Sequence, residues 1–237
     1  MKRRKLLFGM LRRLGLRRAR TQRYRDLLFD LDGTIIDSFD GVSRSYLHAL
    51  EKMGCDISDT SKLKQVIGPP LSESFERLFG LRGQDNEAAV AYYREYYLEN
   101  EAVYACDLYD GVCDAIATLK KRGYRISLAT SKPEKMARLI LERKGITSLF
   151  DFIAGADESV GRKEKADVIR YALDSLDGSD PRATLMIGDR MYDTVGARAL
   201  EIDTLGVLWG FGEATELTES GVLMLAETPS DLMDLLP

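Results

Sequence analysis

Two aspartates, Asp30 and Asp32, close a short apolar run and stand directly before Gly33 and Thr34. Side chains two residues apart on an extended segment point the same way, so both carboxyls can face one spot while Leu31 turns into the core. Two carboxylates this close repel each other unless one holds a proton or a cation lies between them, and either arrangement suits chemistry on phosphate. The competing interpretation is an acidic turn before a helix, because Asp-Gly is a common turn signal.

Three further segments place polar side chains where an apolar run ends or a helical pattern begins. Their residues are Thr130 and Ser131, a lysine at 163 or 165, and Asp189 with Asp193. In a doubly wound sheet the carboxyl ends of the strands border the ligand crevice, so we expect these side chains to gather beside the aspartate pair. Taken alone, the segment at Asp189 is equally consistent with a helix N-cap followed by a surface acid. The convergence of several such segments favours a shared site.

Composition argues against several other kinds of site. The chain has one histidine, His48, and this scarcity disfavours Ser-His and Cys-His triads as well as His-rich zinc sites. Its three cysteines, Cys55, Cys106 and Cys113, have no paired spacing and indicate a reducing compartment. No apolar run approaches the roughly 20 residues of a membrane span. We therefore expect a soluble, cytoplasmic protein in which Asp and Glu carry the acid–base work.

The formal net charge of −4 conceals a basic N-terminal segment. Residues 1–25 contain eleven Lys or Arg and no acid, so the rest of the chain is strongly acidic. Leucines interleave with these arginines, and the pattern could form a basic amphipathic helix on an anionic membrane or nucleic acid. A frayed extension and an organellar presequence are the competing interpretations. A secretory signal is disfavoured, because arginines interrupt the apolar stretch.

Short apolar runs alternate with helical patterns along the chain, which is typical of a parallel sheet flanked by helices. The predicted strands are 27–31, 124–130, 152–156, 184–188 and 204–208, with 222–226 as a candidate edge. Apolar residues at helical spacing lie between them, at 112–119 and 168–176. The predicted fold class is α/β, with a Rossmann-like parallel sheet at its core.

One connection is far longer than an ordinary crossover. About ninety residues separate Asp32 from the strand expected near Tyr124, where a dozen or more suffice for a crossover. A second unit must be inserted there. We predict a small helical cap domain at 38–107, inserted into a core domain made of 26–37 and 108–237.

Helical stripes at 42–53 and 90–98 are expected to frame this cap. Between them, Gly68, Pro69 and Pro70 form a rigid turn that could reach over the site and contact the leaving group of a substrate. A purely structural turn fits these residues equally well. The aromatic residues of the second stripe are more typical of a packed core than of a base-stacking platform.

The ordered set DLDGT, then TS, then a lysine, then GDRxxD resembles the haloacid dehalogenase superfamily of hydrolases. The resemblance covers the chain from Leu27 onward, and the insertion resembles the helical C1 cap of that superfamily. The segment IGPPL at 67–71, the run GDRMYD at 188–193 and the run LGVLWGFG at 205–212 are similar to the phosphoglycolate phosphatase branch and its 5′-nucleotidase-like relatives.

This resemblance implies that Asp30 attacks phosphorus and becomes phosphorylated, as a nucleophile that need not first lose a proton. Asp32 would be the acid–base residue that protonates the leaving oxygen and later activates water. A proton there is plausible, because crowded carboxyls raise one another's pKa. The resemblance also implies a Mg²⁺ site formed by Asp30, the main-chain carbonyl of Asp32, Asp189 and Asp193.

A substrate phosphate is expected to contact the hydroxyl of Thr130 and the backbone N–H of Ser131, placed at a helix start. Ser131 with Glu134 also matches a capping box. Lys165 is preferred over Lys163 as the lysine that neutralises the phosphoryl group, although neither lysine is followed by proline as in the Lys-Pro pair common in the superfamily. The predicted substrate-binding set also includes Gly33, Thr34, Gly68 and Pro69.

The sequence thus predicts a Mg²⁺-dependent phosphomonoester hydrolase whose partner is a small-molecule phosphomonoester. Phosphoglycolate is the first expected substrate and a nucleoside 5′-monophosphate the second. No nucleic acid is expected on the core, whereas the basic tail could contact anionic surfaces. An alternative of another class is a non-catalytic scaffold with a membrane- or nucleic-acid-binding tail, and the intact acidic set argues against it.

Overall fold

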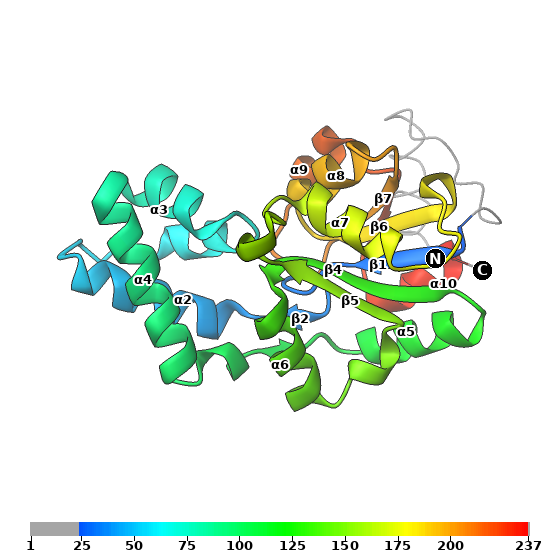
Figure 1. Ribbon diagram of the computed structural model, residues 1–237, viewed down its shortest axis with the longest axis horizontal. Coiled ribbons are helices and arrows are strands. Elements are labelled where there is room, and N and C mark those ends of the chain that lie inside the picture. The colour runs from blue at the N-terminus through cyan, green and yellow to red at the C-terminus, as the bar shows by residue number, and fades with distance from the viewer. Residues whose placement is uncertain (1–23, 237) are drawn as a thin grey trace, which may run out of the picture.

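The computed structural model describes residues 24–236, and a six-stranded parallel sheet forms its centre (Figure 1). The strands lie in the order β5-β4-β1-β6-β7-β8. Their bounds are β1 Asp26–Phe29, β4 Arg125–Pro133, β5 Phe152–Ala156, β6 Thr184–Gly188, β7 Asp203–Val207 and β8 Met224–Ala226. The predicted α/β class is confirmed, and the candidate edge strand is present as β8.

Helices cover both faces of this sheet (Figure 1). Their bounds are α2 Phe39–Lys52, α3 Leu71–Phe79, α4 Gly83–Glu99, α5 Val112–Lys121, α6 Glu134–Lys144, α7 Lys165–Asp174, α8 Met191–Arg198, α9 Ala214–Ser220 and α10 Leu232–Leu235. Short 3-10 helices lie at Ser61–Val66, Ala102–Tyr104, Thr147–Leu149, Glu158–Val160, Pro181–Ala183 and Pro229–Asp231. α7 and α8 pack on one face of the sheet, and α5 and α6 pack on the other.

Alternation along β1 explains these two layers. Leu27 and Phe29 belong to the core that contains α5 and α6, whereas Leu28 belongs to the core that contains α7 and α8. All three side chains are fully buried. Successive side chains of a strand point to opposite faces, so a strand covered on both faces needs a continuous apolar run.

The order of the strands reverses at β1. The sheet continues with β4 and β5 on one side of β1 and with β6, β7 and β8 on the other. The register places Phe29 beside Leu128 of β4 and beside Ile187 of β6. In open parallel sheets, ligands bind at the carboxyl ends of the strands at such a reversal, and this end carries the predicted site residues.

The helices α2, α3 and α4 stand apart from the sheet, at one end of the molecule (Figure 1). The chain leaves the sheet through β2, Ile36–Asp37, and returns through β3, Asp107–Leu108. These two short strands pair with each other in antiparallel fashion, with Ile36 opposite Leu108. We propose that α2, α3 and α4 form the cap predicted at 38–107.

Aromatic rings fill the space between these three helices. Tyr46 of α2 is fully buried, and its ring centre lies 4.7 Å from that of Phe75 and 4.9 Å from that of Tyr93. Tyr93 in turn stacks on Tyr97, with 5.5 Å between ring centres. The aromatic stripe is therefore packed, in the way that buried aromatic residues usually are.

β4 extends beyond the strand predicted at 124–130. It continues to Pro133, which pairs with Ala156 of β5 after a shift in register, and α6 begins only at Glu134. Pro133 occupies the N-cap of that helix, without a side-chain cap bond. The predicted capping box of Ser131 and Glu134 is therefore wrong, because pairing with β5 keeps this backbone extended.

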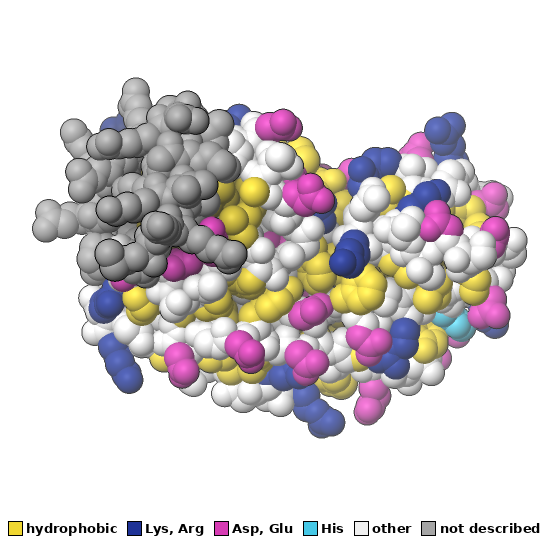
Figure 2. All heavy atoms as spheres, turned by 180° about the vertical axis from the view of Figure 1, so that it is seen from behind, with side chains coloured by type: hydrophobic (Ala, Val, Ile, Leu, Met, Phe, Trp, Pro, Cys, Tyr) yellow, Lys and Arg dark blue, Asp and Glu magenta, His cyan; other side chains and the backbone are white. Residues whose placement is uncertain are grey.

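Charged side chains are spread over the surface. Seen from behind, acidic and basic groups are interspersed on the described part of the face rather than gathered in one field (Figure 2). Within residues 24–236, no helix combines the length and apolar character that a membrane crossing needs. The basic segment predicted at 1–25 lies outside the described residues except for its last two.

Candidate active site

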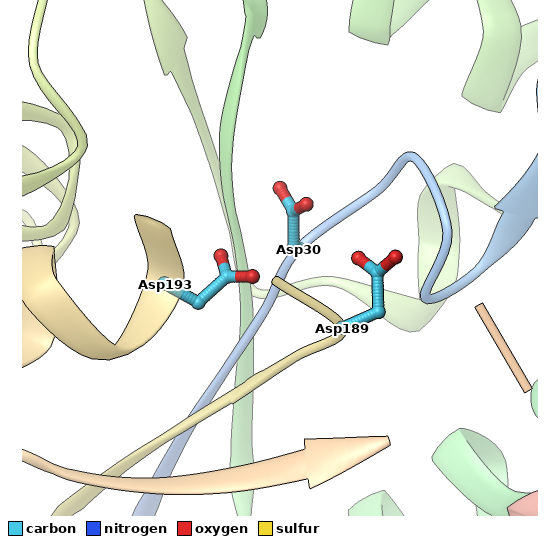
Figure 3. A group of neighbouring side chains, drawn as sticks. All are labelled: Asp30, Asp189 and Asp193. Atoms are coloured by element: carbon cyan, nitrogen blue, oxygen red, sulfur yellow. The ribbon is translucent and has the colours of Figure 1, made fainter. Parts of the chain in front are cut away.

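Three carboxyl groups meet at the carboxyl ends of β1 and β6 (Figure 3). Asp30 directly follows β1, Asp189 directly follows β6, and Asp193 lies in the first turn of α8. One carboxylate oxygen of each lies within 4.8 Å of the others. Pairing of the two strands brings the first two together, because the Asp30 N–H donates to the carbonyl of Ile187 at 2.9 Å. The sequence-predicted convergence is present for these residues.

A buried lysine completes this cluster. The ammonium of Lys165 lies 2.7 Å from Asp30 Oδ1 and 2.6 Å from Asp193 Oδ1. Lys165 is the first residue of α7, whereas Lys163 is exposed. Gly196 of α8 permits this approach, because a Cβ atom there would lie 2.7 Å from Cγ of Lys165. Of the two candidate lysines, the structure brings Lys165 to the nucleophile predicted from the sequence.

Burial dominates the electrostatics of the cluster. Burial, opposed chiefly by the Lys165 charge, raises the pKa of Asp30 to about 6. Burial, with the charges of Asp193 and Asp30, raises the pKa of Asp189 well above its usual range. For Lys165, burial lowers the pKa, but Asp193 and Asp30 outweigh it and raise the pKa to about 12. The lysine therefore stays charged while the carboxyls resist ionising together.

The carboxyl cluster fits a divalent cation. When all three carboxyls are ionised, one ammonium group leaves two of their negative charges unbalanced. Mg²⁺ prefers oxygen ligands and is usually held by a few carboxylates together with water. Asp30, Asp189 and Asp193 supply such a set, as predicted. The Asp32 side chain lies outside this cluster, and its predicted contribution is its main-chain carbonyl.

The loop after β7 closes around one of these carboxyls. The backbone N–H of Phe211 donates to Asp189 Oδ2 at 2.8 Å. Gly210 and Gly212 approach so closely that a Cβ atom on either residue would overlap atoms of Asp189. The run of residues that supported the branch resemblance thus has a physical role, because its backbone orients Asp189.

Gly33 and Thr34 also support Asp189. Gly33 has φ of +79°, and a Cβ atom there would overlap the Asp189 carboxylate. Its N–H donates to the carbonyl of Ile36 at 2.8 Å, which holds the turn. Thr34 is fully buried, and its hydroxyl lies 3.5 Å from Asp189 Oδ1. The contacts of Gly33 and Thr34 with a substrate stay predictions.

Asp32 is held by a residue that the sequence reasoning missed. The ammonium of Lys132 lies 3.0 Å from Asp32 Oδ1 and donates to the hydroxyl of Tyr97 at 3.0 Å. The rule that paired Asp30 with Asp32 would have found it. Thr130 and Lys132 are likewise two residues apart at the end of a strand, and such side chains share a face.

Thr130 and Ser131 lie at the end of β4, at the same edge of the sheet. Thr130 is buried, and its hydroxyl accepts the backbone N–H of Lys132 at 3.2 Å. Ser131 is half-buried and belongs to the strand rather than to a helix start. Phosphate contacts from the Thr130 hydroxyl and the Ser131 backbone stay predictions, and the anion-favouring helix start expected beside Ser131 is not there.

The turn at Gly68 and Pro69 lies against the start of α8. The guanidinium of Arg190 donates to the carbonyl of Ile67, and a Cβ atom on Gly68 would lie 3.1 Å from Cγ of Arg190. Pro69 is buried. Arg190 follows Asp189 directly, so the predicted cap contacts a chain neighbour of the carboxyl cluster. This contact was not predicted, although Arg190 lies within the GDR motif.

Comparison with known proteins agrees with this geometry. The family model described as haloacid dehalogenase-like hydrolase matches residues 27–207. The tyrosine-protein kinase PtkA of Mycobacterium tuberculosis is 38% identical over 212 residues, which cover 89% of this chain and 72% of that protein. A 5′-nucleotidase of Pseudomonas aeruginosa is 37% identical over 195 residues, covering 82% and 87%. The crystal structure of a predicted phosphatase from Clostridium acetobutylicum has a TM-score of 0.84 at 34% identity, covering 89% and 97%.

Proposed function

The chain belongs to the haloacid dehalogenase-like hydrolase family as one of its phosphatases, and we propose that it hydrolyses phosphomonoesters through a phosphorylated Asp30, with Mg²⁺ as cofactor. The observation that carries this proposal is the meeting of Asp30, Asp189 and Asp193 with Lys165. A carboxylate nucleophile, oxygen donors for a cation and a fixed ammonium group are the parts that phosphoryl transfer needs.

In the first step, a carboxylate oxygen of Asp30 attacks phosphorus, and the bond between phosphorus and the ester oxygen breaks. The leaving oxygen takes the proton of the Asp32 carboxyl, so the alcohol departs neutral and Asp32 becomes a carboxylate. Asp32 stands two residues after the nucleophile, with its side chain 14% exposed and therefore within reach of a substrate.

In the second step, water attacks the phosphorus of the aspartyl phosphate. Asp32 takes a proton from this water, and the bond between phosphorus and the Asp30 oxygen breaks. Inorganic phosphate leaves, Asp30 returns to a carboxylate, and Asp32 is again protonated. One residue thus acts as acid and then as base, which splits one difficult hydrolysis into two easier reactions.

Positive charge beside Asp30 favours its ionised form, which is the form that attacks phosphorus. A Mg²⁺ ion held by Asp30, Asp189 and Asp193 would neutralise phosphoryl oxygens and favour ionised carboxyls. The ammonium of Lys165 fixes Asp30 Oδ1 at 2.7 Å and adds a charge beside the transferring group. Asp193 holds that ammonium from the other side at 2.6 Å, which sets its direction.

We place phosphoglycolate first among candidate substrates, on the sequence resemblance. The packing of the cap supports a small leaving group, because Tyr93 and Tyr97 are buried and stack on each other at 5.5 Å. Tyr96 stacks on His48 at 4.6 Å. These rings are engaged with one another instead of facing a nucleobase. A nucleoside 5′-monophosphate is the second candidate, favoured by the 5′-nucleotidase relative.

The test is the rate of phosphate release by the purified full-length protein from phosphoglycolate, a sugar phosphate and a nucleoside monophosphate, compared by kcat/KM. We expect activity with Mg²⁺, none in EDTA, and a loss of at least about 1,000-fold in kcat for Asp30→Asn. Asp114→Asn, an exposed acid on α5, is the matched control. Activity that survives Asp30→Asn or chelation would contradict the mechanism.

The kinase relative calls for one further measurement. The protein is incubated with ATP and a tyrosine-containing peptide, and phosphotyrosine is measured beside free phosphate. We expect free phosphate from phosphomonoesters and no phosphotyrosine. Phosphotyrosine formation that depends on Asp30 would instead assign this chain the activity named for that relative.

A further inference from the structure

Lys132 joins the proposed acid–base residue to a helix of the cap. Its ammonium lies 3.0 Å from Asp32 Oδ1 and 3.0 Å from the Tyr97 hydroxyl. Lys132 stands near the end of β4 in the sheet, whereas Tyr97 belongs to α4. One side chain therefore connects the reacting edge of the sheet with the inserted helices.

The surroundings of this ammonium group hold it in one place. The Lys132 side chain is 7% exposed, and its ammonium lies 5.2 Å from the centre of the Tyr97 ring. A buried cation is costly unless it is paired, and an aromatic face adds attraction to the pairing. Asp32 supplies the opposite charge in its ionised form, which the first step of the reaction leaves behind, and Tyr97 supplies an acceptor and a ring. A solvated lysine would show none of these contacts.

We propose that Lys132 is a positioning residue that fixes the direction of the Asp32 carboxyl for proton exchange with the leaving oxygen. Tyr97 holds Lys132 in that place when the cap helices pack against the core. The inference rests on the acid–base role proposed for Asp32. It assigns Lys132 a part in leaving-group departure, distinct from the part of Lys165 beside the nucleophile.

Substrate chemistry separates this role from a role in binding. An alkyl phosphate releases a strongly basic alkoxide that needs the proton of Asp32, whereas para-nitrophenyl phosphate releases a stable phenolate that does not. A residue that positions Asp32 therefore matters for the first substrate and little for the second. A residue that binds an anionic part of the substrate would matter instead for phosphoglycolate, which carries a carboxylate.

The experiment measures kcat/KM, which reports the phosphorylation step, for ethyl phosphate, para-nitrophenyl phosphate and phosphoglycolate. Each ratio between substrates is taken on one preparation, so a partly unfolded variant does not change it. We expect Lys132→Met to lower kcat/KM for ethyl phosphate by about 100-fold and for para-nitrophenyl phosphate by less than about 5-fold. Lys132→Arg should restore part of the loss, and Lys135→Met, on an exposed lysine of α6, should change neither value.

Two further variants test the coupling. Tyr97→Phe keeps the ring and removes the acceptor, so we expect the same pattern with a smaller loss, of about 5- to 10-fold for ethyl phosphate. Asp32→Asn should lower kcat/KM strongly for ethyl phosphate and little for para-nitrophenyl phosphate. The double variant Asp32→Asn with Lys132→Met should lose little more, because both substitutions remove the same proton donation to the leaving oxygen.

Three results would overturn the inference, and only the third also contradicts the proposed function. Equal losses for ethyl and para-nitrophenyl phosphate in Lys132→Met, with a selective loss in Asp32→Asn, would assign Lys132 a structural role. A rise in KM confined to phosphoglycolate would make Lys132 a substrate-binding group. If Asp32→Asn itself shows no dependence on the leaving group, the acid–base role of Asp32 fails, and the role of Lys132 fails with it.

Discussion

Asp30 is under two opposite demands. A nucleophile must be ionised, yet burial raises the pKa of Asp30 to about 6, and Asp193 and Asp32 add to the rise. Lys165 opposes this effect from 2.7 Å. One ammonium group does not balance three ionised carboxyls, which is the physical case for a cation among them.

The first prediction concerns pH. The ordinary pKa of an Asp carboxyl is 3.8, and that of Asp30 in the folded, metal-free protein is about 6. At a pH between these two values, Asp30 holds a proton in the folded state but has lost it in the unfolded state. This contribution to stability is complete below about pH 4 and is lost as pH rises through about 6, a change of about 3 kcal/mol for this group. Asn does not ionise, so Asp30→Asn removes this dependence of stability on pH. At about pH 7.5, where the wild type has lost the contribution, the variant should have the larger free energy of unfolding.

Urea unfolding in EDTA at about pH 5 and about pH 7.5 measures both free energies. Mg²⁺ should then stabilise the wild type at the higher pH, because it binds the folded state, and should stabilise Asp30→Asn less. Without metal, the wild type should lose free energy of unfolding relative to Asp30→Asn as the pH rises from about 5 to about 7.5. A relative gain over this range would contradict the raised pKa of Asp30.

Gly33 provides a second prediction at this scale. Gly33→Ala places a Cβ atom onto the Asp189 carboxylate at φ of +79°, so we expect at least about a 100-fold loss in kcat/KM and weaker Mg²⁺ binding. Gly54 is the matched control. Its φ is +70°, but no atom lies within 4 Å of a Cβ there, so Gly54→Ala has the backbone strain of about 1 kcal/mol without the overlap. Equal losses of activity in Gly33→Ala and Gly54→Ala would show that the overlap with Asp189 is not the cause.

At the scale of elements, the positions of the strand ends determine where the carboxyl groups of the site lie. β1 and β6 end beside each other and deliver Asp30 and Asp189, and α8 starts close enough to add Asp193. Sequence periodicity could predict these elements, since each strand is an apolar run bounded by polar residues. It could not predict that β4 continues to Pro133, because that extension depends on pairing with β5, a contact distant in sequence.

The pairing of β1 with β4 supports a third prediction. Asp26 is fully buried and accepts from Arg125 through both carboxylate oxygens, at 2.5 and 2.7 Å. Arg125→Met leaves this carboxylate buried without that partner, so we expect a loss of about 2 to 3 kcal/mol in the free energy of unfolding. Arg44→Met, which breaks an exposed pair with Asp40, should change it by less than about 0.5 kcal/mol. Urea titrations at neutral pH compare the two, and similar losses would contradict the difference in burial.

At the scale of the whole molecule, two distant parts of the chain meet beside the site. Arg190, at the start of α8, contacts Ile67, and Lys132 of β4 contacts Tyr97 of α4. Neither contact could be predicted from the sequence, because each depends on how the inserted helices pack against the core. The carboxyl cluster could be predicted, because Asp30 and Asp189 directly follow two strands of one sheet and Asp193 stands one turn after Asp189.

The basic segment gives the last prediction. We propose that residues 1–25 contact anionic surfaces, on the basis of their charge and interleaved leucines. Deleting residues 1–23 should leave kcat/KM unchanged and should remove binding to vesicles rich in anionic lipid, with the binding of the full chain falling as salt rises. Co-sedimentation at two salt concentrations measures this. Unchanged vesicle binding after deletion would end the proposal.

The pairing of β2 with β3 has a consequence for how such a protein can change over time. Because Ile36 lies opposite Leu108, the segment 38–106 begins and ends at neighbouring points of the backbone. A piece of chain with adjacent ends can be exchanged in one event without redirecting the rest. Recombination at two codons could therefore replace the helices between β2 and β3 while Asp30, Asp189 and Asp193 stay unchanged. The exchanged protein would keep its reaction and gain a different range of substrates.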